Sequence, residues 1–533
     1  MTTLTNPILP GFNPDPSICR VPRTCADTGQ TIDDYYIATS TFEWFGGVMI
    51  YHSRDLRHWR LIGPALTRRE QINMLGNPDS GGVWAPCLSY ADGSFWLVYS
   101  DTKTWQQGYK DVHNFVVTCD DIEAGAWSDP IYLNASGFDP SLFHDLDGRK
   151  WVLNQLWDHR PGRHPFAGIV IQEFDPAGQG LVGPIRNIFQ GSSARVCEGP
   201  HLYHKDGWYY LLTAEGGTAR HHCVTVARSR DLLGPYEIHP DNPILTSRHD
   251  LGLVLQNAGH ADWVETATGE WWMVHLASRP LAGQSILGRE TCAQRLEWCS
   301  DGWPRLAGGG REPRVEWDAP NLATHPQPST PATLSFDTER IPACLQSLRI
   351  PAEESWVSLT ARPGALRLYG QESLASRHRT SLLARRLVDF HARAEIRLDV
   401  TPRDFQHMAG LVAIYDSASW CYCYVSANDT GQRVLRMEWS VDGGFGGVND
   451  DLLILPAQGP VDIACELRHL ELRFFVRCDS EWQPVGPTRP GDFLGDEYGH
   501  HGHFTGGMMG FACQDLSGQG NHADFLSFTY LSL

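Results

Sequence analysis

The stretch Asp206-Gly-Trp-Tyr-Tyr-Leu-Leu212 joins a tight polar turn to a short strand rich in aromatic residues. Four other stretches have the same form: Asp33-Asp-Tyr-Tyr-Ile-Ala38, Asp92-Gly-Ser-Phe-Trp-Leu-Val-Tyr99, Asp147-Gly-Arg-Lys-Trp-Val-Leu153 and Thr268-Gly-Glu-Trp-Trp-Met-Val274. The turn residues Asp34, Gly93, Gly148, Gly207 and Gly269 follow one another at steps of 59, 55, 59 and 62 residues. Repeats of this length made of hairpin strands are typical of propeller blades, which bury their faces against their neighbours. Five repeats predict five blades, whose innermost strands converge on one axis.

The repeat fades after Trp303, and a segment rich in proline follows. Such a segment predicts a stiff, extended connector. Beyond it, short stretches of alternating character are separated by turn signals: 366–369, 394–398, 411–415, 420–425 and 472–476. Strands of period two at this spacing favour a β-sandwich. We therefore predict an all-β protein with a five-bladed β-propeller at 1–315, a linker at 316–332 and a β-sandwich at 333–533.

Composition narrows the classes of partner. The 533 residues carry a net charge of −19, which argues against a nucleic acid or an anionic membrane as partner. The chain has no apolar segment near Met1 and no run of 18 apolar residues, so we predict a cytoplasmic protein that does not bind membranes. The 14 cysteines include no metal-type CxxC pair and are interpreted as reduced thiols, with one or two disulfides if the protein is exported.

Three acidic residues stand in related settings. Asp15 lies in Gly11-Phe-Asn-Pro-Asp-Pro-Ser17 and Asp139 in Gly137-Phe-Asp-Pro-Ser141, while Glu198 precedes Gly-Pro-His201. A carboxylate between two prolines is rigidly aimed, because each ring fixes its own φ and restricts the residue before it. An ordinary Asp-Pro turn or a structural acceptor explains any one of these residues. The repetition of the pattern makes that explanation weaker for the set.

The acids recur at one place in the repeat. Asp139 and Glu198 each precede their turn glycine by 9 residues, and Asp15 precedes Asp34 by 19, which an insertion of ten residues over 22–31 would explain. This shared phase predicts that all three reach the axis on innermost strands. Two carboxylates facing each other across a pocket are what glycosidic hydrolysis requires, one to protonate the leaving oxygen and one to activate water.

These stretches resemble glycoside hydrolase family 43, and specifically its two-domain β-xylosidase branch. The resemblance rests on 13–17, 138–141 and 198–202 and continues through Ala38-Thr-Ser-Thr-Phe-Glu-Trp-Phe45, Gly76-Asn-Pro-Asp-Ser-Gly-Gly82, Trp84-Ala-Pro86, 213–217, 259–261, 287–291, 359–364 and 504–506. It covers essentially the whole chain. It implies a five-bladed propeller followed by a β-sandwich, and hydrolysis with inversion of the anomeric centre.

The resemblance also assigns roles. It implies that Asp15 is the general base, Glu198 the general acid and Asp139 the acid that orients Glu198 and tunes its pKa. It places Arg289 on the sugar hydroxyls and the acids, and His260 at the floor of the funnel, where a satisfied core histidine is the alternative. Phe42, Trp84 and Trp157 are expected to form an aromatic wall around the terminal xylose, or else to pack blades, and Phe504 to close the pocket from the sandwich.

The predicted function is an inverting, exo-acting β-1,4-xylosidase that releases xylose from short xylo-oligosaccharides. The alternatives are an α-L-arabinofuranosidase, alone or as a second activity, and a sugar-binding propeller without catalysis. No cofactor is required and no metal ligand is assigned, although a calcium ion near His260 is left open, as is a homo-oligomer. Three departures from the family pattern stand out: a short segment at 279–289, which puts leaving-group selectivity in doubt, Cys87 after Trp-Ala-Pro, and an insertion near Cys25.

Overall fold

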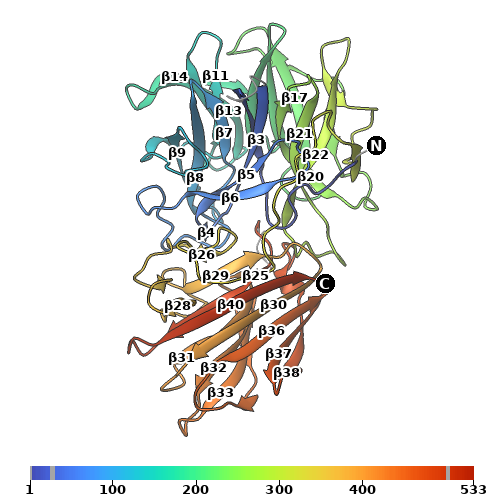
Figure 1. Ribbon diagram of the computed structural model, residues 1–533. Coiled ribbons are helices and arrows are strands. Elements are labelled where there is room, and N and C mark those ends of the chain that lie inside the picture. Colours follow the sequence, from blue (N-terminus) through green and yellow to red (C-terminus); the bar gives the residue numbers. More distant parts are fainter. Residues whose placement is uncertain (1–2, 25–30, 500–503) are drawn as a thin grey trace.

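The computed structural model describes residues 3–24, 31–499 and 504–533, and nearly all of its regular structure is β-strand (Figure 1). A propeller, blue to yellow in Figure 1, lies above a two-sheet sandwich drawn in orange and red. The fold class predicted from the sequence is therefore confirmed. Across the described ranges, no helix is long and apolar enough to span a membrane, and the helical structure is a single 3-10 turn, η1 (Asp492–Leu494).

Five antiparallel sheets form the blades, and in each the first four strands lie side by side in chain order. Blade 1 holds β2 (Ser17–Thr24), β3 (Thr31–Thr39), β5 (Gly47–Ser53) and β6 (Arg60–Leu66). Blade 2 holds β7 (Cys87–Ala91), β8 (Ser94–Thr104), β9 (Asp111–Cys119) and β10 (Ile131–Asn134). Blade 3 holds β11 (Ser141–His144), β12 (Lys150–Trp157), β13 (Phe166–Asp175) and β14 (Gly180–Phe189). Blade 4 holds β15 (Glu198–Lys205), β16 (Trp208–Glu215), β17 (Cys223–Ser229), β18 (Glu237–Ile238) and β19 (Leu245–Thr246). Blade 5 holds β20 (Gln256–Glu265), β21 (Trp271–Ser278), β22 (Arg289–Trp298) and β23 (Pro304–Leu306).

The first strand of each blade lies at the axis. β2 contacts β7 and β20, β11 contacts β7 and β15, and β15 contacts β20, so these five strands close a ring. The segments that lead into them therefore meet at one end of the axis. A further pair, β1 (Thr3–Thr5) with β24 (Glu316–Asp318), fastens the start of the described chain to the first residues of the predicted linker.

The sandwich consists of two antiparallel sheets. The first runs in the order β27 (Val357–Ser358), β28 (Leu366–Tyr369), β40 (His522–Ser532), β30 (His391–Val400), β36 (Val461–Arg468), β37 (Glu471–Cys478), β38 (Glu481–Pro490), with β25 (Thr333–Leu334) beside β40. The second runs β34 (Gly444–Gly447), β33 (Arg433–Val441), β32 (Ser419–Ala427), β31 (His407–Asp416), β39 (Met508–Asp515), β29 (Ser381–Arg386), β26 (Gln346–Leu348), β4 (Trp44–Phe45), with β35 (Leu453–Ile454) beside β33. Each stretch predicted as a sandwich strand lies within one of these strands.

One strand of the second sheet comes from the propeller half of the chain. In β4, Trp44 pairs with Leu348 and Phe45 with Ser347 of β26. Trp44 and Leu348 also belong to an apolar cluster that contains Phe12 and Met508. Fully burying a large apolar side chain is worth about 1.5–3 kcal/mol, so this cluster holds the two domains together.

The structure corrects one predicted turn. Asp33 and Asp34 lie inside β3, where they pair with Pro22 and Val21 of β2, and the hairpin turn itself falls outside the described residues. Both carboxylates are paired with arginines, Asp33 with Arg20 at 2.5 Å and Asp34 with Arg54 at 2.7 Å. These two acidic residues therefore look like a turn signal in the sequence, but in the structure they form ion pairs along a long β-hairpin. Much of the proposed insertion over 22–31, including Cys25, lies outside the described residues.

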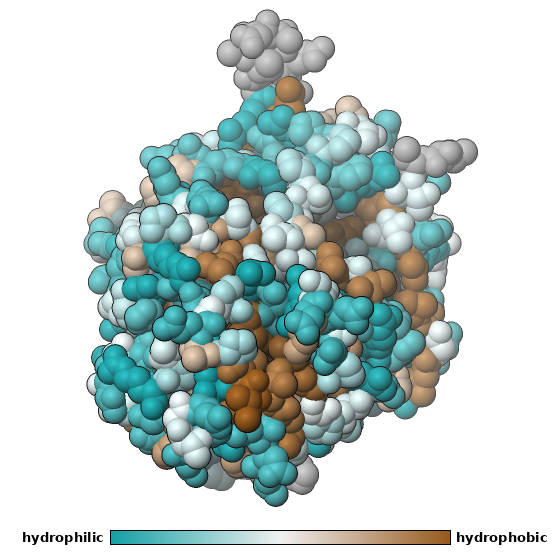
Figure 2. All heavy atoms as spheres, turned by 60° about the horizontal axis from the view of Figure 1, so that its bottom comes forward, coloured by the Kyte–Doolittle hydropathy of each residue, from teal (hydrophilic) through white to brown (hydrophobic). Residues whose placement is uncertain are grey.

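The cysteines of the described residues are unpaired. Thirteen cysteines in the described part of the chain are free thiols, ten of them buried. Figure 2 shows a mainly hydrophilic face with hydrophobic side chains gathered near its centre. The three acids predicted to reach the propeller axis direct the search for the site to that axis.

Candidate active site

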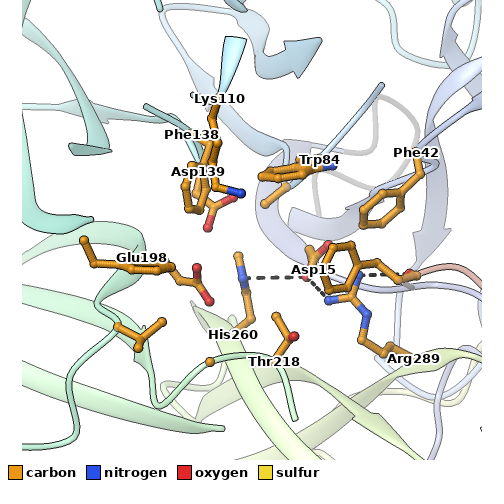
Figure 3. A pocket seen from close by; sticks show the side chains of 15 residues that line it. Asp15, Phe42, Trp84, Lys110, Phe138, Asp139, Glu198, Thr218, His260 and Arg289 are labelled. Atoms are coloured by element: carbon orange, nitrogen blue, oxygen red, sulfur yellow. Dashed lines mark hydrogen bonds and ion pairs between the residues drawn. The ribbon is translucent and has the colours of Figure 1, made fainter. Parts of the chain in front are cut away.

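A cavity of about 170 Å³ lies at the end of the axis where the innermost strands begin (Figure 3). It is lined by Asp15, Phe42, Trp84, Ala85, Lys110, Phe138, Asp139, Phe166, Val196, Glu198, Gly217, Thr218, His260, Arg289 and Phe504. Sites for drug-sized ligands usually measure about 300–1,000 Å³. The smaller volume suits a single sugar ring better than a length of chain.

Asp15 and Asp139 reach the cavity through the same local structure. Each lies two residues before an innermost strand, β2 or β11, and each has a positive φ, 52° for Asp15 and 53° for Asp139. A residue other than glycine pays about 1–3 kcal/mol to adopt such a conformation, and residues of this kind are found mainly at functional sites. Glu198 is the first residue of β15. The common position of the three acids in the sequence repeat is therefore, in the structure, the start of the innermost strand of three blades.

Asp15 is buried among donors. It accepts hydrogen bonds from the Ser40 hydroxyl at 2.6 Å and from Arg289 Nη1 at 3.1 Å. Burial by itself would raise the pKa of Asp15, but Arg289, His260 and Ser40 outweigh it and hold that pKa below its ordinary value. Asp15 is therefore a carboxylate at neutral pH, as a general base must be.

Glu198 and Asp139 both have a raised pKa, so they hold their protons at higher pH than ordinary carboxylic acids do. Figure 3 shows Glu198 across the cavity from Asp15. Burial and the charge of Asp15 raise the pKa of Glu198 to about 8, against which Lys110 and Arg289 act. Burial, together with Glu198 and Asp15, raises the pKa of Asp139 well above its usual range. Asp139 Oδ2 accepts a hydrogen bond from the backbone N–H of Gly199 at 3.1 Å, which ties it to the segment that carries Glu198.

Arg289 connects the base to the sandwich. Besides Asp15, its guanidinium donates through Nη2 to the backbone oxygen of Phe504 at 3.0 Å. The same group lies over the rings of Phe42 and Phe504, at 5.4 and 5.5 Å from their centroids. Arg289 Nε is buried with no hydrogen-bond partner in the described structure, so the guanidinium retains a donor. The predicted position of Arg289 between acids and sugar is consistent with this geometry.

His260 lines the cavity. Its Nδ1 is 3.7 Å from Asp15 Oδ1, too long for a hydrogen bond, and burial lowers its pKa to about 4, so the imidazole is neutral near pH 7. Gly199 packs on the ring, since a Cβ there would be 3.0 Å from Cε1. No set of three His, Cys, Asp or Glu side chains in the described ranges could hold a metal ion. Because the Arg289 cation already bonds Asp15, these residues fit a second cation at this carboxylate poorly, and the calcium ion stays a prediction.

The expected aromatic wall is present in part. Phe42, Trp84 and Phe504 line the cavity, with ring centroids 5.9 Å apart for Phe42–Phe504 and 6.3 Å for Trp84–Phe504. Trp157 does not line it. The ring of Trp157 packs 6.1 Å from that of Phe138, which takes the place at the cavity surface that the sequence analysis gave to Trp157.

Lys110 is a lining residue that the sequence analysis missed. Its ammonium donates to the Trp105 backbone oxygen at 3.1 Å and lies 4.6 Å from the Trp157 ring centroid and 5.2 Å from that of Trp84. Burial lowers the pKa of Lys110 to about 8, although Glu198 and Asp139 act to raise it. Lys110 lies between β8 and β9 in a loop with no repeated pattern, so nothing in the sequence singled it out.

Comparisons with known proteins agree with the site. A sequence model described as glycosyl hydrolases family 43 matches residues 4–304, and one described as the beta xylosidase C-terminal concanavalin A-like domain matches residues 333–531. The chain belongs to glycosyl hydrolase family 43 and is a glycoside hydrolase. The predicted division at 1–315, 316–332 and 333–533 remains a prediction beside these ranges.

Three relatives indicate how close the likeness is. The crystal structure of a xylan β-1,4-xylosidase from Bacillus halodurans superposes with a TM-score of 0.95 at 49% identity, covering 99% of each chain. The xylosidase/arabinosidase 43B of Humicola insolens is 45% identical over 541 residues, 99% of this chain and 98% of the relative. The xylan 1,3-beta-xylosidase of a Vibrio species is 44% identical over 546 residues, 99% of each chain.

Proposed function

We propose that the protein is an inverting, exo-acting β-1,4-xylosidase that releases xylose from the non-reducing ends of short xylo-oligosaccharides. The observation that carries this proposal is the contrast between the two carboxyl groups of one small cavity. Asp15 is held ionised, while Glu198, with a pKa of about 8, is held protonated. A base and an acid on opposite sides of one sugar ring are what a single displacement by water requires.

The proposed reaction follows from these two states. Asp15 takes a proton from a water molecule, whose oxygen attacks the anomeric carbon on the face opposite the leaving group. The glycosidic C–O bond breaks, and Glu198 gives its proton to the leaving oxygen. Asp139, which bonds the backbone next to Glu198, keeps that acid in place. Room for the attacking water requires the carboxyl groups to stand roughly 6.5–9.5 Å apart.

The cavity walls support action at chain ends. Aromatic faces of Phe42, Trp84 and Phe504 surround a volume of about 170 Å³, and Phe504 comes from the second domain. A cavity of this size holds one terminal unit more readily than several consecutive units of a chain. Release of single sugars is therefore favoured over cleavage within a chain.

A second candidate is α-L-arabinofuranosidase activity, alone or beside the first. Arabinofuranose and xylopyranose present similar hydroxyls without a C6 group, and the Humicola insolens relative is named for both sugars. The Vibrio relative is named for a 1,3 linkage, so the linkage also requires a direct test.

The test compares three substrates under one condition: β-1,4-xylobiose, β-1,3-xylobiose and 4-nitrophenyl α-L-arabinofuranoside. We expect the highest kcat/KM on β-1,4-xylobiose. Preference for the 1,3-linked disaccharide would contradict the proposed linkage, and cleavage of the arabinofuranoside alone would favour the second candidate. If the protein binds xylose but cleaves none of the three, the binding propeller without catalysis replaces both.

The pH dependence of kcat/KM is expected to be bell-shaped. Activity requires ionised Asp15 and therefore falls as the pH drops through its lowered pKa, which lies below the ordinary value of about 4. Activity also requires protonated Glu198 and therefore falls as the pH rises through about 8. Initial rates measured between about pH 3 and pH 10 check both limbs. A rate that still increases above pH 9 would contradict the assignment of Glu198 as the acid.

The remaining partner expectations are proposals of the same kind. The net charge of −19 supports the view that neither nucleic acid nor an anionic membrane is bound. Assembly into a homo-oligomer stays a prediction, which light scattering on the purified protein tests.

A further inference from the structure

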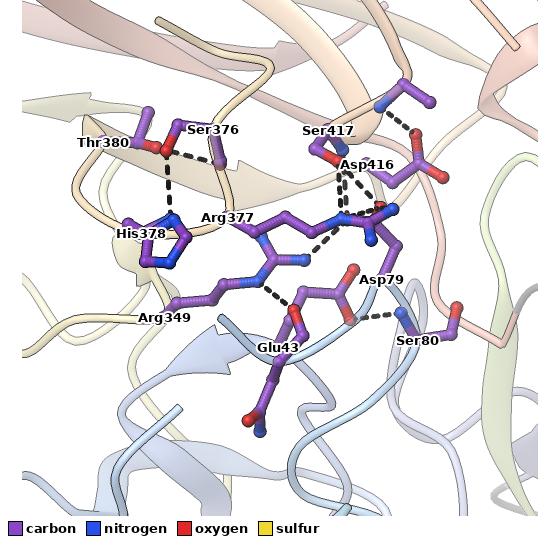
Figure 4. A network of polar contacts seen from close by, with 12 residues as sticks. Glu43, Asp79, Ser80, Arg349, Ser376, Arg377, His378, Thr380, Asp416 and Ser417 are labelled. Atoms are coloured by element: carbon purple, nitrogen blue, oxygen red, sulfur yellow. Dashed lines mark hydrogen bonds and ion pairs between the residues drawn. The ribbon is translucent and has the colours of Figure 1, made fainter. Parts of the chain in front are cut away.

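Two of the motifs that resemble the family contain residues that the proposed reaction does not use, although Ser40 and Phe42 of the first motif belong to the site. They are the stretches 38–45 and 76–82, which come from different loops of the propeller. In the structure they meet against the sandwich at the residues Asp79 and Ser80 (Figure 4). Asp79 is buried and lies close to the cavity without lining it.

The side chain of Asp79 is held by the sandwich domain. Arg349 donates to its Oδ1 at 2.6 Å, and Arg377 and the hydroxyl of Ser417 donate to its Oδ2 at 2.8 and 2.7 Å. Burial would raise the pKa of Asp79, but the two arginines lower it below its ordinary value. The carboxylate is therefore ionised and is bound by groups from three different segments of the sandwich.

Arg349 ties both propeller motifs to this carboxylate. Its side chain is almost completely buried and donates through Nε to the backbone oxygen of Asn77 at 2.8 Å. Its backbone N–H donates to the backbone oxygen of Glu43 at 2.9 Å. Glu43 Oε2 in turn accepts from the backbone N–H of Ser80 at 3.0 Å. Removing one partner of such a buried set leaves a charge without compensation.

The main chain at Asp79 and Ser80 holds the aromatic side of the cavity. The backbone oxygen of Asp79 accepts from Trp105 Nε1 at 3.1 Å, and that of Ser80 accepts from Trp84 Nε1 at 2.9 Å. The Ser80 hydroxyl accepts from the backbone N–H of Phe504 at 3.2 Å. Trp84 and Phe504 line the cavity, and the Trp105 ring lies 5.2 Å from that of Phe504. Asp79 and Ser80 thus bind the sandwich through the Asp79 side chain and orient the aromatic wall of the cavity through their main chain and the Ser80 hydroxyl.

We propose that Asp79 is a positioning residue for the sugar cavity: clamped by Arg349, it fixes the Asp79–Ser80 main chain and so sets the separation of Trp84 and Phe504. This inference rests on the proposed function, because it takes the cavity to hold a pentose. The sandwich then contributes to sugar affinity through a propeller carboxylate as well as through Phe504 itself.

The kind of kinetic effect follows from what the wall touches. Trp84 and Phe504 are not among the groups that transfer protons, so they hold the sugar similarly in the ground state and in the transition state. Loss of such uniform binding raises KM and leaves kcat nearly unchanged. Xylose, the product that would occupy the same cavity, should lose affinity by the same factor.

The experiment compares three variants with the wild type: Asp79→Asn, Arg349→Met and Ser80→Ala. For Asp79→Asn and Arg349→Met we expect KM and the inhibition constant of xylose to rise together by about 10-fold, with kcat within about 2-fold. Ser80→Ala, which leaves no buried charge unpaired, should raise both constants by about 3-fold through loss of one hydrogen bond. Arg393→Met is the matched control. Arg393 is a buried sandwich arginine that is paired with Glu395 and Glu466 and does not line the cavity, and this change should lower stability without changing either constant.

Unchanged KM and xylose inhibition in folded variants would overturn the proposal, as would a fall in kcat alone, whatever happens to the melting temperature. If Asp79→Asn and Arg349→Met do not fold, Arg377→Met takes their place, since it removes a half-exposed donor to Asp79 Oδ2 and should raise both constants by a smaller factor. Turnover by the wild type tests the proposed function separately. The ratio of the variant's KM to that of the wild type can be measured on whichever pentoside is cleaved. Calorimetric titration with xylose gives the same ratio without any turnover.

Discussion

Glu198→Gln is expected to lower kcat on β-1,4-xylobiose by on the order of 10³-fold, because glutamine cannot donate a proton to the leaving oxygen. A 2,4-dinitrophenyl β-xyloside, whose leaving group is stable as an anion, should lose far less. The structural basis is that Glu198 is a buried acid with a pKa of about 8, so it carries the proton near neutral pH. Rates on both substrates, measured at one pH, give the ratio.

The control for this prediction is Glu466→Gln, which changes a glutamate of the sandwich that is paired with Arg393 and Arg468. Its rates on both substrates should stay close to those of the wild type. Equal losses on xylobiose and on the dinitrophenyl xyloside in Glu198→Gln would show that Glu198 is not the proton donor.

Asp15→Asn is expected to lower kcat by about 10³- to 10⁴-fold on every substrate, good or poor leaving group alike. The reason is that Asp15 acts on the attacking water, which every substrate needs. The amide would still occupy the site between Ser40 and Arg289, so binding of xylose should be retained within a few-fold. Steady-state rates with both substrates and a xylose titration separate the two effects.

The variant offers a chemical check of its own. Azide is a nucleophile that needs no general base, so it should restore part of the rate on the dinitrophenyl xyloside and yield the α-xylosyl azide. An Asp15→Asn enzyme that keeps most of its activity would remove Asp15 from the role of base.

Much of the propeller could be predicted because its blades repeat. A glycine with positive φ lies in the turn after the innermost strand at Gly93, Gly148, Gly207 and Gly269, and a buried aromatic-rich strand follows. The repetition also gave the phase of Asp139 and Glu198. The same reasoning failed at Asp33-Asp34, because a carboxylate paired with an arginine on a long hairpin has the same composition as a turn.

The site was less predictable where it depends on packing between distant segments. Trp157 and Phe138 are both aromatic residues at blade 3, and only the fold shows that Phe138 reaches the cavity while Trp157 packs behind it. Lys110 belongs to a loop without periodicity, and its cation is placed by rings from several segments. The ion pairs of Asp79 join residues some 270 positions apart, such as Arg349, and no local pattern encodes them.

The measurement that tests the central claim most directly is proton NMR of β-1,4-xylobiose during the first minutes of hydrolysis, before mutarotation mixes the anomers. Direct attack by water activated at Asp15 predicts that the xylose released from the non-reducing end first appears as the α-anomer. Early β-xylose would mean that the configuration is retained, and would contradict a single displacement between Asp15 and Glu198.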